Sequence, residues 1–186
     1  NYWPFQYKLW RVEDRFTATW VKGKYYQNAF LGWFMEKTNN IPTVSRGYLI
    51  AKDFEMTVGR KPEDEEYKAL RAEVDRVAGT RDPGESDVPP LEVVPTPVLE
   101  TRRDVLGLPF EPSRQSHAEY INELFQIMMR RFVELNYEAF RKGLDLLVFP
   151  QGTRSIRLSR GHIGLAQIAL HAEKTVVPVG CNGSDE

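Results

Sequence analysis

Segments with the periodicity of β-strands alternate along this chain with segments that have the periodicity of amphipathic helices. The β-prone or short apolar runs are residues 16–21, 41–44, 146–149 and 175–179. The runs with apolar residues at helical spacing are 28–37, 63–78, 116–143 and 161–173. Strands separated by helices tend to pair in parallel, with the helices packed against the sheet. The sequence therefore predicts an α/β fold with a mixed, partly parallel sheet flanked by helices.

Capping signals set the ends of the two best-marked helices. Ser116 and Glu119 form a Ser-x-x-Glu capping box ahead of an apolar stripe, and Gly143 ends that helix. Pro62 and a run of acidic residues begin the helix predicted over 63–78, where negative charges complement the helix dipole. We interpret this acidic run as a solvated helix start rather than a metal site.

Residues 80–115 differ from the rest of the chain in composition. Seven prolines fall between Pro83 and Pro112, and few apolar residues recur periodically. This composition is typical of an extended surface loop. We interpret the stretch as a proline-rich insertion, with a lid or a partner-binding surface as the alternative. Residues 1–186 are otherwise predicted to form a single domain, truncated at both ends.

Charge and composition exclude several classes of protein. The chain has 25 basic and 26 acidic residues, so it has no global field that would attract nucleic acid. Its single cysteine, Cys181, cannot form an internal disulfide. No window approaches the roughly 18 apolar residues of a membrane span. No group of histidine, cysteine and aspartate has metal-ligand spacing, so we expect no metal. From the balanced charge we also expect no nucleic-acid partner.

The turn at residues 149–155, Phe-Pro-Gln-Gly-Thr-Arg-Ser, joins a predicted buried strand to a helix. Ligands of open α/β sheets gather at the carboxyl ends of the strands. Gly152 allows close backbone approach, Thr153 and Ser155 carry hydroxyls, and Arg154 presents a planar donor fork suited to phosphate. The residues alone leave two interpretations open, an anion site at a strand end or a surface turn with an incidental arginine.

The same turn resembles the Phe-Pro-Glu-Gly-Thr-Arg-Ser block of the lysophosphatidic acid and glycerol-3-phosphate acyltransferase family. Val21-Lys22 is similar to the lysine-bearing strand of that family. Residues 41–47, Ile-Pro-Thr-Val-Ser-Arg-Gly, resemble its second block, whose arginine binds the acceptor phosphate. Residues 176–180, Val-Val-Pro-Val-Gly, resemble its fourth block, and 161–172 resemble the helix before it. The resemblance therefore implies an acyltransferase-like fold.

The resemblance also implies an activity. The protein would be an O-acyltransferase that moves a fatty acyl group from acyl-CoA or acyl-carrier protein to a glycerol-phosphate-type acceptor, such as 1-acylglycerol 3-phosphate, in phospholipid synthesis. The thioester is a co-substrate, and no cofactor is expected. The implied phosphate-binding residues are Arg46, Arg154, Lys22, Gly152 and Thr153, and the implied pocket or positioning residues are Pro150, Gln151, Ser155, Val177 and Pro178. A lipid substrate implies a membrane surface as partner and a place on the cytoplasmic face of a membrane, peripheral or anchored by segments outside this chain.

Two features depart from the family pattern. The catalytic His-x4-Asp block of the family is not found, because the residues at the fifth position after the three histidines, His117, His162 and His171, are Asn122, Gln167 and Val176. The order of the blocks places that pair at or upstream of residue 1, with its histidine as general base. His117 is interpreted as a first-turn helix residue, and the others as helix-surface or packing residues. Gln151 replaces a glutamate, which keeps hydrogen bonding but removes the charge.

These departures leave two rivals to the enzyme. One is a non-catalytic lipid- or acyl-binding relative of the family that has lost the His/Asp pair. The other is a phosphoryl-handling α/β enzyme that uses the same anion-binding turn, although the chain has no Walker-type loop. Cys181 is interpreted as a small apolar residue without a chemical role.

Overall fold

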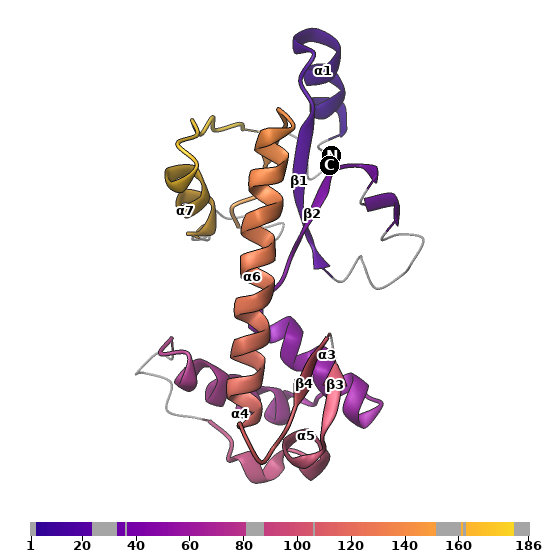
Figure 1. Ribbon diagram of the computed structural model, residues 1–186, viewed down its shortest axis with the longest axis vertical. Helices are drawn as coiled ribbons and strands as arrows, with labels where there is room; N and C mark the ends of the chain where they lie inside the picture. The colour runs from indigo at the N-terminus through magenta and orange to yellow at the C-terminus, as the bar shows by residue number, and fades with distance from the viewer. Residues whose placement is uncertain are drawn as a thin grey trace. The chain divides into compact units, whose positions relative to one another are not determined.

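The computed structural model describes residues 3–23, 33–35, 37–80, 88–105, 107–151, 161 and 163–180. The chain divides into two compact units, which we call the sheet unit and the helical unit. The sheet unit comprises Asn1–Thr43 and Arg131–Glu186, and the helical unit comprises Val44–Arg130. Figure 1 labels the helices and most of the strands in both units. The longest helix, α6 (His117–Arg141), contributes residues to both.

The sheet unit contains three parallel strands in the order β2-β1-β5. They are β1 (Thr17–Lys22), β2 (Asn40–Thr43) and β5 (Asp145–Leu147). The register places Lys22 opposite Thr43 and Thr17 opposite Asp145. Helices α1 (Trp3–Glu13) and α7 (Gly164–His171) belong to the same unit. The predicted α/β class is therefore confirmed in its coarse form, a small parallel sheet flanked by helices.

Helix α6 packs on the central strand of the sheet unit through Trp20. The Trp20 ring meets Phe132 edge-on, with the ring centroids 4.8 Å apart. Its indole N–H donates to the Asn136 side-chain oxygen at 2.8 Å, and Asn136 is fully buried. The side-chain N–H of Asn136 donates to the Phe132 carbonyl at 2.7 Å. The polar groups at this helix–sheet contact are therefore satisfied, as buried polar groups need to be.

Two predictions of the sheet unit have different outcomes. The buried strand expected over 175–179 is wrong, because residues 174–180 have no regular structure and Val177 is 73% exposed. A β-branched run forms a strand only where a neighbour offers a pleated surface to pair with, and no described strand pairs with this segment. Of the helix predicted over 28–37, residues 33–35 and 37 are described and helical, and the rest lie outside the described residues.

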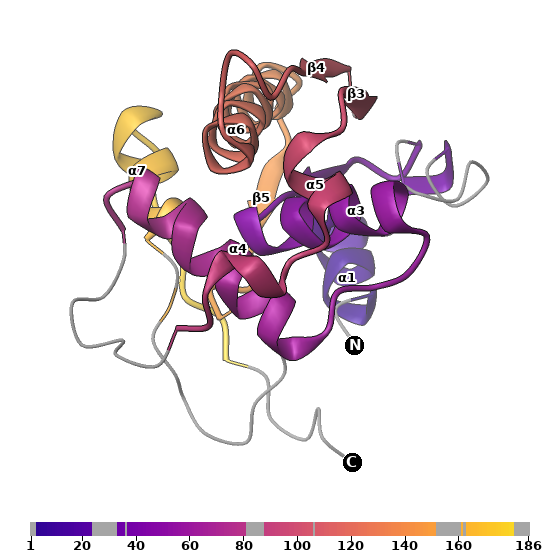
Figure 2. The ribbon, with the colours of Figure 1, turned by 90° about the horizontal axis from the view of Figure 1, so that it is seen from below.

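The helical unit is built on helices α3, α4 and α5 around the amino-terminal part of α6 (Figure 2). Their bounds are Arg46–Val58, Asp64–Val77 and Thr96–Glu100. A 3-10 turn, η2 (Leu91–Val93), precedes α5, and β3 (Arg103–Val105) pairs antiparallel with β4 (Leu108–Phe110). The buried core of this unit comprises Leu49, Ile50, Phe54, Ala69, Leu70, Val74, Val94, Val98, Phe110, Ala118, Tyr120, Ile121 and Leu124.

Local capping explains where these helices begin and end. The Ser45 hydroxyl accepts the Tyr48 backbone N–H and starts α3, which ends at Gly59 with φ +81°. The predicted capping box of α6 is confirmed, since the Ser116 backbone N–H donates to the Glu119 carboxylate at 2.7 Å. Helix α4 lies within the predicted range. Its acidic start is not wholly solvated, because Glu66 is buried and pairs with Arg60.

The surface-loop interpretation of residues 80–115 is wrong for the described part of that stretch. Residues 91–110 form η2, α5, β3 and β4, and Val94, Val98 and Phe110 are buried in the core. The prolines stand where their ring fits. Pro90 and Pro95 precede helical turns, and Pro97 lies in the first turn of α5, where no backbone N–H is needed. These three prolines therefore mark the starts of short helical elements, whereas Pro109 lies inside β4.

Candidate functional site

The carboxyl ends of the parallel strands bring several predicted site residues to one edge of the sheet. Lys22 ends β1 beside Thr43 of β2, and the Thr43 hydroxyl donates to the Val21 carbonyl at 3.0 Å. Strand β5 runs in the same direction, and the chain leaves it towards Pro150 and Gln151. Lys22 and the start of the predicted anion-binding turn thus lie at the edge where ligands of α/β sheets gather.

Gly161 lies beside Pro150, the residue that begins the predicted anion-binding turn after β5. A Cβ at position 161 would lie 3.3 Å from the Cβ of Pro150, closer than ordinary van der Waals contact, so a larger residue would fit only if Pro150 shifted slightly. Residues 151–160 separate these two positions in the sequence. Gly152, Thr153, Arg154 and Ser155 lie within this segment and outside the described residues, so their predicted roles stay predictions.

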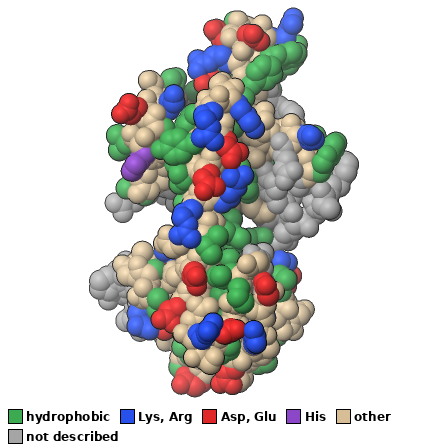
Figure 3. Space-filling view, in the orientation of Figure 1, with side chains coloured by type: hydrophobic (Ala, Val, Ile, Leu, Met, Phe, Trp, Pro, Cys, Tyr) green, Lys and Arg blue, Asp and Glu red, His purple; other side chains and the backbone are tan. Residues whose placement is uncertain are grey.

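The sequence around this segment is strongly biased in charge. No aspartate or glutamate occurs between Asp145 and Glu173, whereas arginine occurs at positions 154, 157 and 160. The face of the molecule in Figure 3 shows the opposite pattern, with basic and acidic side chains interspersed, as expected from a net charge of −1. A local excess of positive charge within a neutral chain favours an anionic ligand at this place.

Arg46 is the first residue of α3 and belongs to the helical unit. Its Nε donates to the Asn122 side-chain oxygen at 2.7 Å, and its guanidinium lies 4.3 Å from the ring centroid of Phe125. The pKa of Arg46 is lowered, and burial is the largest cause. The negative charge of Asp75 raises this pKa, and the positive charge of Arg71 lowers it further. An arginine stays charged at this pKa, so Arg46 is a cation held in a fixed orientation.

The structure tests the predicted site only in part. Arg46 and Lys22 belong to different units, and Arg154 lies outside the described residues, so the meeting of Arg46 and Arg154 on one phosphate stays a prediction. Val177 and Pro178 are exposed and lie in a segment without regular structure, which gives no support to their role as pocket residues.

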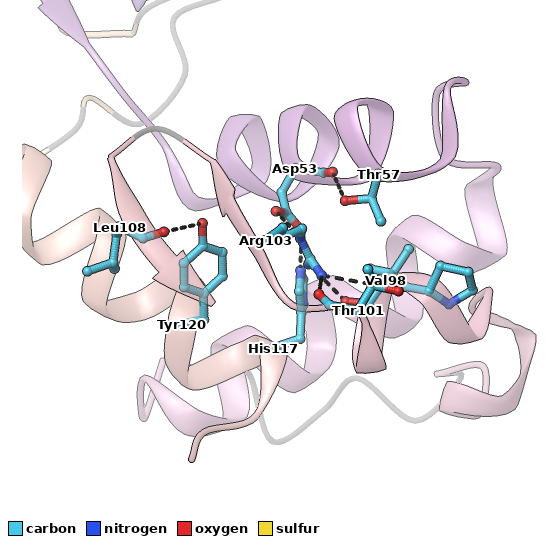
Figure 4. A network of polar contacts seen from close by, with 9 residues as sticks. Asp53, Thr57, Val98, Thr101, Arg103, Leu108, His117 and Tyr120 are labelled. Atoms are coloured by element: carbon cyan, nitrogen blue, oxygen red, sulfur yellow. Dashed lines mark hydrogen bonds and ion pairs between the residues drawn. The ribbon is translucent and has the colours of Figure 1, made fainter. Parts of the chain in front are cut away.

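A buried polar cluster in the helical unit was not predicted (Figure 4). The Asp53 carboxylate accepts three hydrogen bonds, from Nε of Arg103 at 2.9 Å, from Nη2 of Arg103 at 2.6 Å and from Nε2 of His117 at 2.9 Å. Arg103 also donates to the carbonyls of Thr101 and Val98 and lies over the Phe110 ring, 4.4 Å from its centroid. The cluster ties α3, β3 and the start of α6 together.

This cluster contains a His–Asp pair, but it lacks the access that a catalytic pair needs. The side chains of Asp53 and His117 are 0% and 3% exposed. Burial alone would raise the pKa of Asp53, but the hydrogen bonds from His117 and Arg103 outweigh it and hold that pKa below its ordinary value. The imidazole nitrogen nearest the carboxylate is already engaged, so we assign the pair a structural role. An aspartate three and four residues after the apolar Ile50 and Leu49, and so on their helix face, is the sequence signal that could have indicated it.

The described part of the chain contains one further histidine, His171. His171 Nδ1 lies 2.8 Å from the Gln167 carbonyl on the exposed surface of α7, and His162 lies outside the described residues. Among the described residues, no group of three or more histidine, cysteine, aspartate or glutamate side chains could hold a metal ion. Within the same residues, no helix has both the length and the apolar character to cross a membrane.

A pocket of about 310 Å³ lies in the sheet unit at the opposite edge of the sheet. Its walls come from α1, the start of β1 and the residues before β2, including Tyr7, Trp10, Phe16, Phe34 and Met35. The amino ends of parallel strands are not where α/β sheets usually bind ligands. The pocket is therefore separate from the edge that carries Lys22 and Pro150.

The fold and this edge define an α/β protein with a candidate anion-binding site at the carboxyl ends of parallel strands. No family model matches the chain, and neither a curated protein nor a solved structure matches it.

Proposed function

We propose that this protein is an acyltransferase that moves a fatty acyl group from a thioester donor to the hydroxyl of a glycerol-phosphate-type acceptor. The observation that carries the proposal is the edge of the parallel sheet where Lys22 and Pro150–Gln151 lie, directly ahead of a sequence segment rich in arginine. That placement agrees with the order of the acyltransferase-like blocks in the sequence. It favours a site for a phosphorylated acceptor over a surface turn with an incidental arginine.

In this reaction the C–S bond of the thioester breaks and an ester C–O bond forms. The acceptor hydroxyl loses its proton to a general base, and the thiol leaves with a proton. Arg46 and Arg154 bind the acceptor phosphate, Lys22 adds positive charge, and Gly152 and Thr153 offer backbone and hydroxyl donors. The general base belongs to the His-x4-Asp block, which this chain does not contain.

The test measures acyl transfer by the protein that carries these 186 residues, from palmitoyl-CoA to 1-acylglycerol 3-phosphate, by release of the free thiol. A charge-assisted hydrogen bond is worth roughly 1.5–3 kcal/mol, so Arg46→Ala and Arg154→Ala should each raise the acceptor KM about 10- to 100-fold. Arg131→Ala is the control, because Arg131 is exposed and pairs only with Glu134 and Glu138 among the described residues. Unchanged acceptor kinetics in both test variants would defeat the assignment.

A second candidate is a non-catalytic lipid- or acyl-binding relative. The observation that favours it is the lack of a histidine with the His-x4-Asp pattern, together with the structural role of His117. The same experiment separates the two functions. Acceptor binding that depends on Arg46, without thiol release from any acyl-CoA, would establish the binding protein and exclude the enzyme.

A further inference from the structure

The first turn of α3 lies against one face of α4. Gly47, the second residue of α3, is buried, and a Cβ at this position would collide with the Tyr67 hydroxyl and lie 3.2 Å from Arg71 Nη1. Tyr67 and Arg71 are four residues apart on α4, so they occupy the same face of that helix. Both side chains therefore reach the place where α3 begins with Arg46.

The charges at this place do not balance. Arg71 Nε donates to Asp75 at 2.6 Å, and this carboxylate is the counter-charge that acts on both arginines. The like charge of Arg71 is strong enough at Arg46 to lower the pKa of Arg46, in addition to the larger effect of burial. Counting described residues alone, two guanidinium groups share one carboxylate, which leaves one positive charge in excess.

Donors at this place have no described acceptor. Arg46 and Arg71 each make one side-chain hydrogen bond through Nε, to Asn122 and to Asp75. Among the residues that the structure describes, the Nη groups of both arginines and the hydroxyl of Tyr67 have no hydrogen-bond partner. Arg71 is 37% exposed, so a ligand can reach it from solvent. Two donor forks and one hydroxyl, contributed by two helices, suit the tetrahedral oxygens of a phosphate group.

We propose that Arg71 is a second phosphate-binding arginine, which together with Arg46 and the Tyr67 hydroxyl receives a phosphomonoester. This inference rests on the proposed function and adds to it a residue that sequence reasoning missed. Arg71 lies in the middle of an ordinary amphipathic helix, where nothing in the sequence separates it from a surface arginine. The ligand is dianionic, and its source is either the head group of a lipid precursor or free phosphate.

The experiment titrates the full chain with sn-glycerol 3-phosphate by isothermal titration calorimetry, with inorganic phosphate and glycerol as parallel arms. Arg71→Ala should raise the Kd for glycerol 3-phosphate at least tenfold. The Kd of Arg71→Lys should lie between those of wild type and Arg71→Ala, because lysine keeps the charge but loses the planar pair of donors. Arg76→Ala is the matched control. Arg76 lies on the same helix and pairs with Glu73, as Arg71 pairs with Asp75. The Arg76→Ala variant should have a Kd within twofold of that of wild type.

The outcomes separate this inference from the proposed function. Loss of binding in Arg46→Ala with an unchanged Kd in Arg71→Ala would overturn the role of Arg71 and leave the proposed function standing. Equal losses in the Arg71 and Arg76 variants would also overturn it, since helix charge alone would then explain the effect. Binding of inorganic phosphate but not of glycerol 3-phosphate would support Arg71 and contradict the proposed acceptor. Wild-type protein that binds neither phosphate compound would refute both.

Discussion

Replacing Asp53 by asparagine should destabilise the protein strongly, because it removes the only carboxylate that the described structure places against Arg103. The wild-type carboxylate accepts one hydrogen bond on Oδ1 and two on Oδ2. An asparagine amide of the same shape has one oxygen and one NH₂ group. In one orientation its NH₂ faces both Arg103 Nη2 and His117 Nε2, and in the other it faces Arg103 Nε. Either orientation sets donors against donors and leaves a guanidinium buried without a counter-charge.

The size of the effect follows from this geometry. Removing one partner of a buried ion pair costs about 3–5 kcal/mol. The lower end applies, because Arg103 keeps the carbonyls of Thr101 and Val98 and the face of Phe110. A loss of about 3 kcal/mol is a large part of the 5–15 kcal/mol by which domains are usually stable. At about 2–4 °C per kcal/mol for a chain of this size, the melting temperature should fall by about 6–12 °C.

Far-UV circular dichroism is the suitable assay. All four tryptophans precede residue 44, so tryptophan fluorescence reports on the sheet unit, whereas Asp53 lies in the helical unit. Asp145→Asn is the control, because Asp145 is 35% exposed and its partner Arg15 is 59% exposed. An exposed pair of this kind contributes about 0–1 kcal/mol. Equal shifts of the melting temperature in both variants would refute the reasoning.

Three further predictions follow from single contacts. The pKa of Asp53 is lowered in the folded protein, so its stabilising contribution is present above the unfolded pKa of about 4 and is lost as the pH falls through the folded value. The difference in unfolding free energy between wild type and Asp53→Asn, measured by urea unfolding, should therefore shrink below about pH 4. Gly47→Ala should destabilise the helical unit by about 1–3 kcal/mol, because the methyl group meets the Tyr67 hydroxyl. Adding Tyr67→Phe should restore part of this loss. An unchanged free energy of unfolding in Gly47→Ala would contradict the packing. Asn136→Ala should cost about 1–3 kcal/mol by leaving the Trp20 indole N–H buried without an acceptor, and its effect should diminish in a Trp20→Phe background.

Local signals in the sequence predicted much of the fold. The capping box of Ser116 and Glu119 located the start of the longest helix, and the alternation at 16–21 located the central strand. These signals act over three to six residues, so they do not depend on the rest of the fold. The same reasoning failed at 175–179, where strand formation depends on a neighbouring strand. It also failed over 88–110, where prolines were taken as signs of a loop although Pro90, Pro95 and Pro97 lie at the starts of helical turns and Pro109 lies within a strand.

Side chains that act through long-range contacts could not be predicted. Helix α3 was missed, although Ser45 and Gly59 mark both of its ends. The partners of Asp53 are distant in the sequence, since Arg103 and His117 lie 50 and 64 residues after it. No periodic pattern relates the three residues. Arg71 is a similar case, since its charge becomes informative only when Arg46 and Tyr67 lie beside it. Sequence motifs identify residues that are adjacent in the chain, whereas a buried network is defined by the packing of distant elements.

Two of the cations proposed for the acceptor, Arg46 and Lys22, differ in how much freedom they would lose on binding. Arg46 is already held by Asn122 and the ring of Phe125, so a ligand would find its guanidinium in place. Lys22 is exposed at the end of β1, and ordering a lysine side chain costs up to about 2 kcal/mol. That cost is comparable with the roughly 1.5–3 kcal/mol gained from a charge-assisted hydrogen bond. Lys22→Ala should therefore change the Kd for glycerol 3-phosphate less than threefold, whereas Arg46→Ala should change it at least tenfold. A larger effect at Lys22 than at Arg46 would contradict this reasoning.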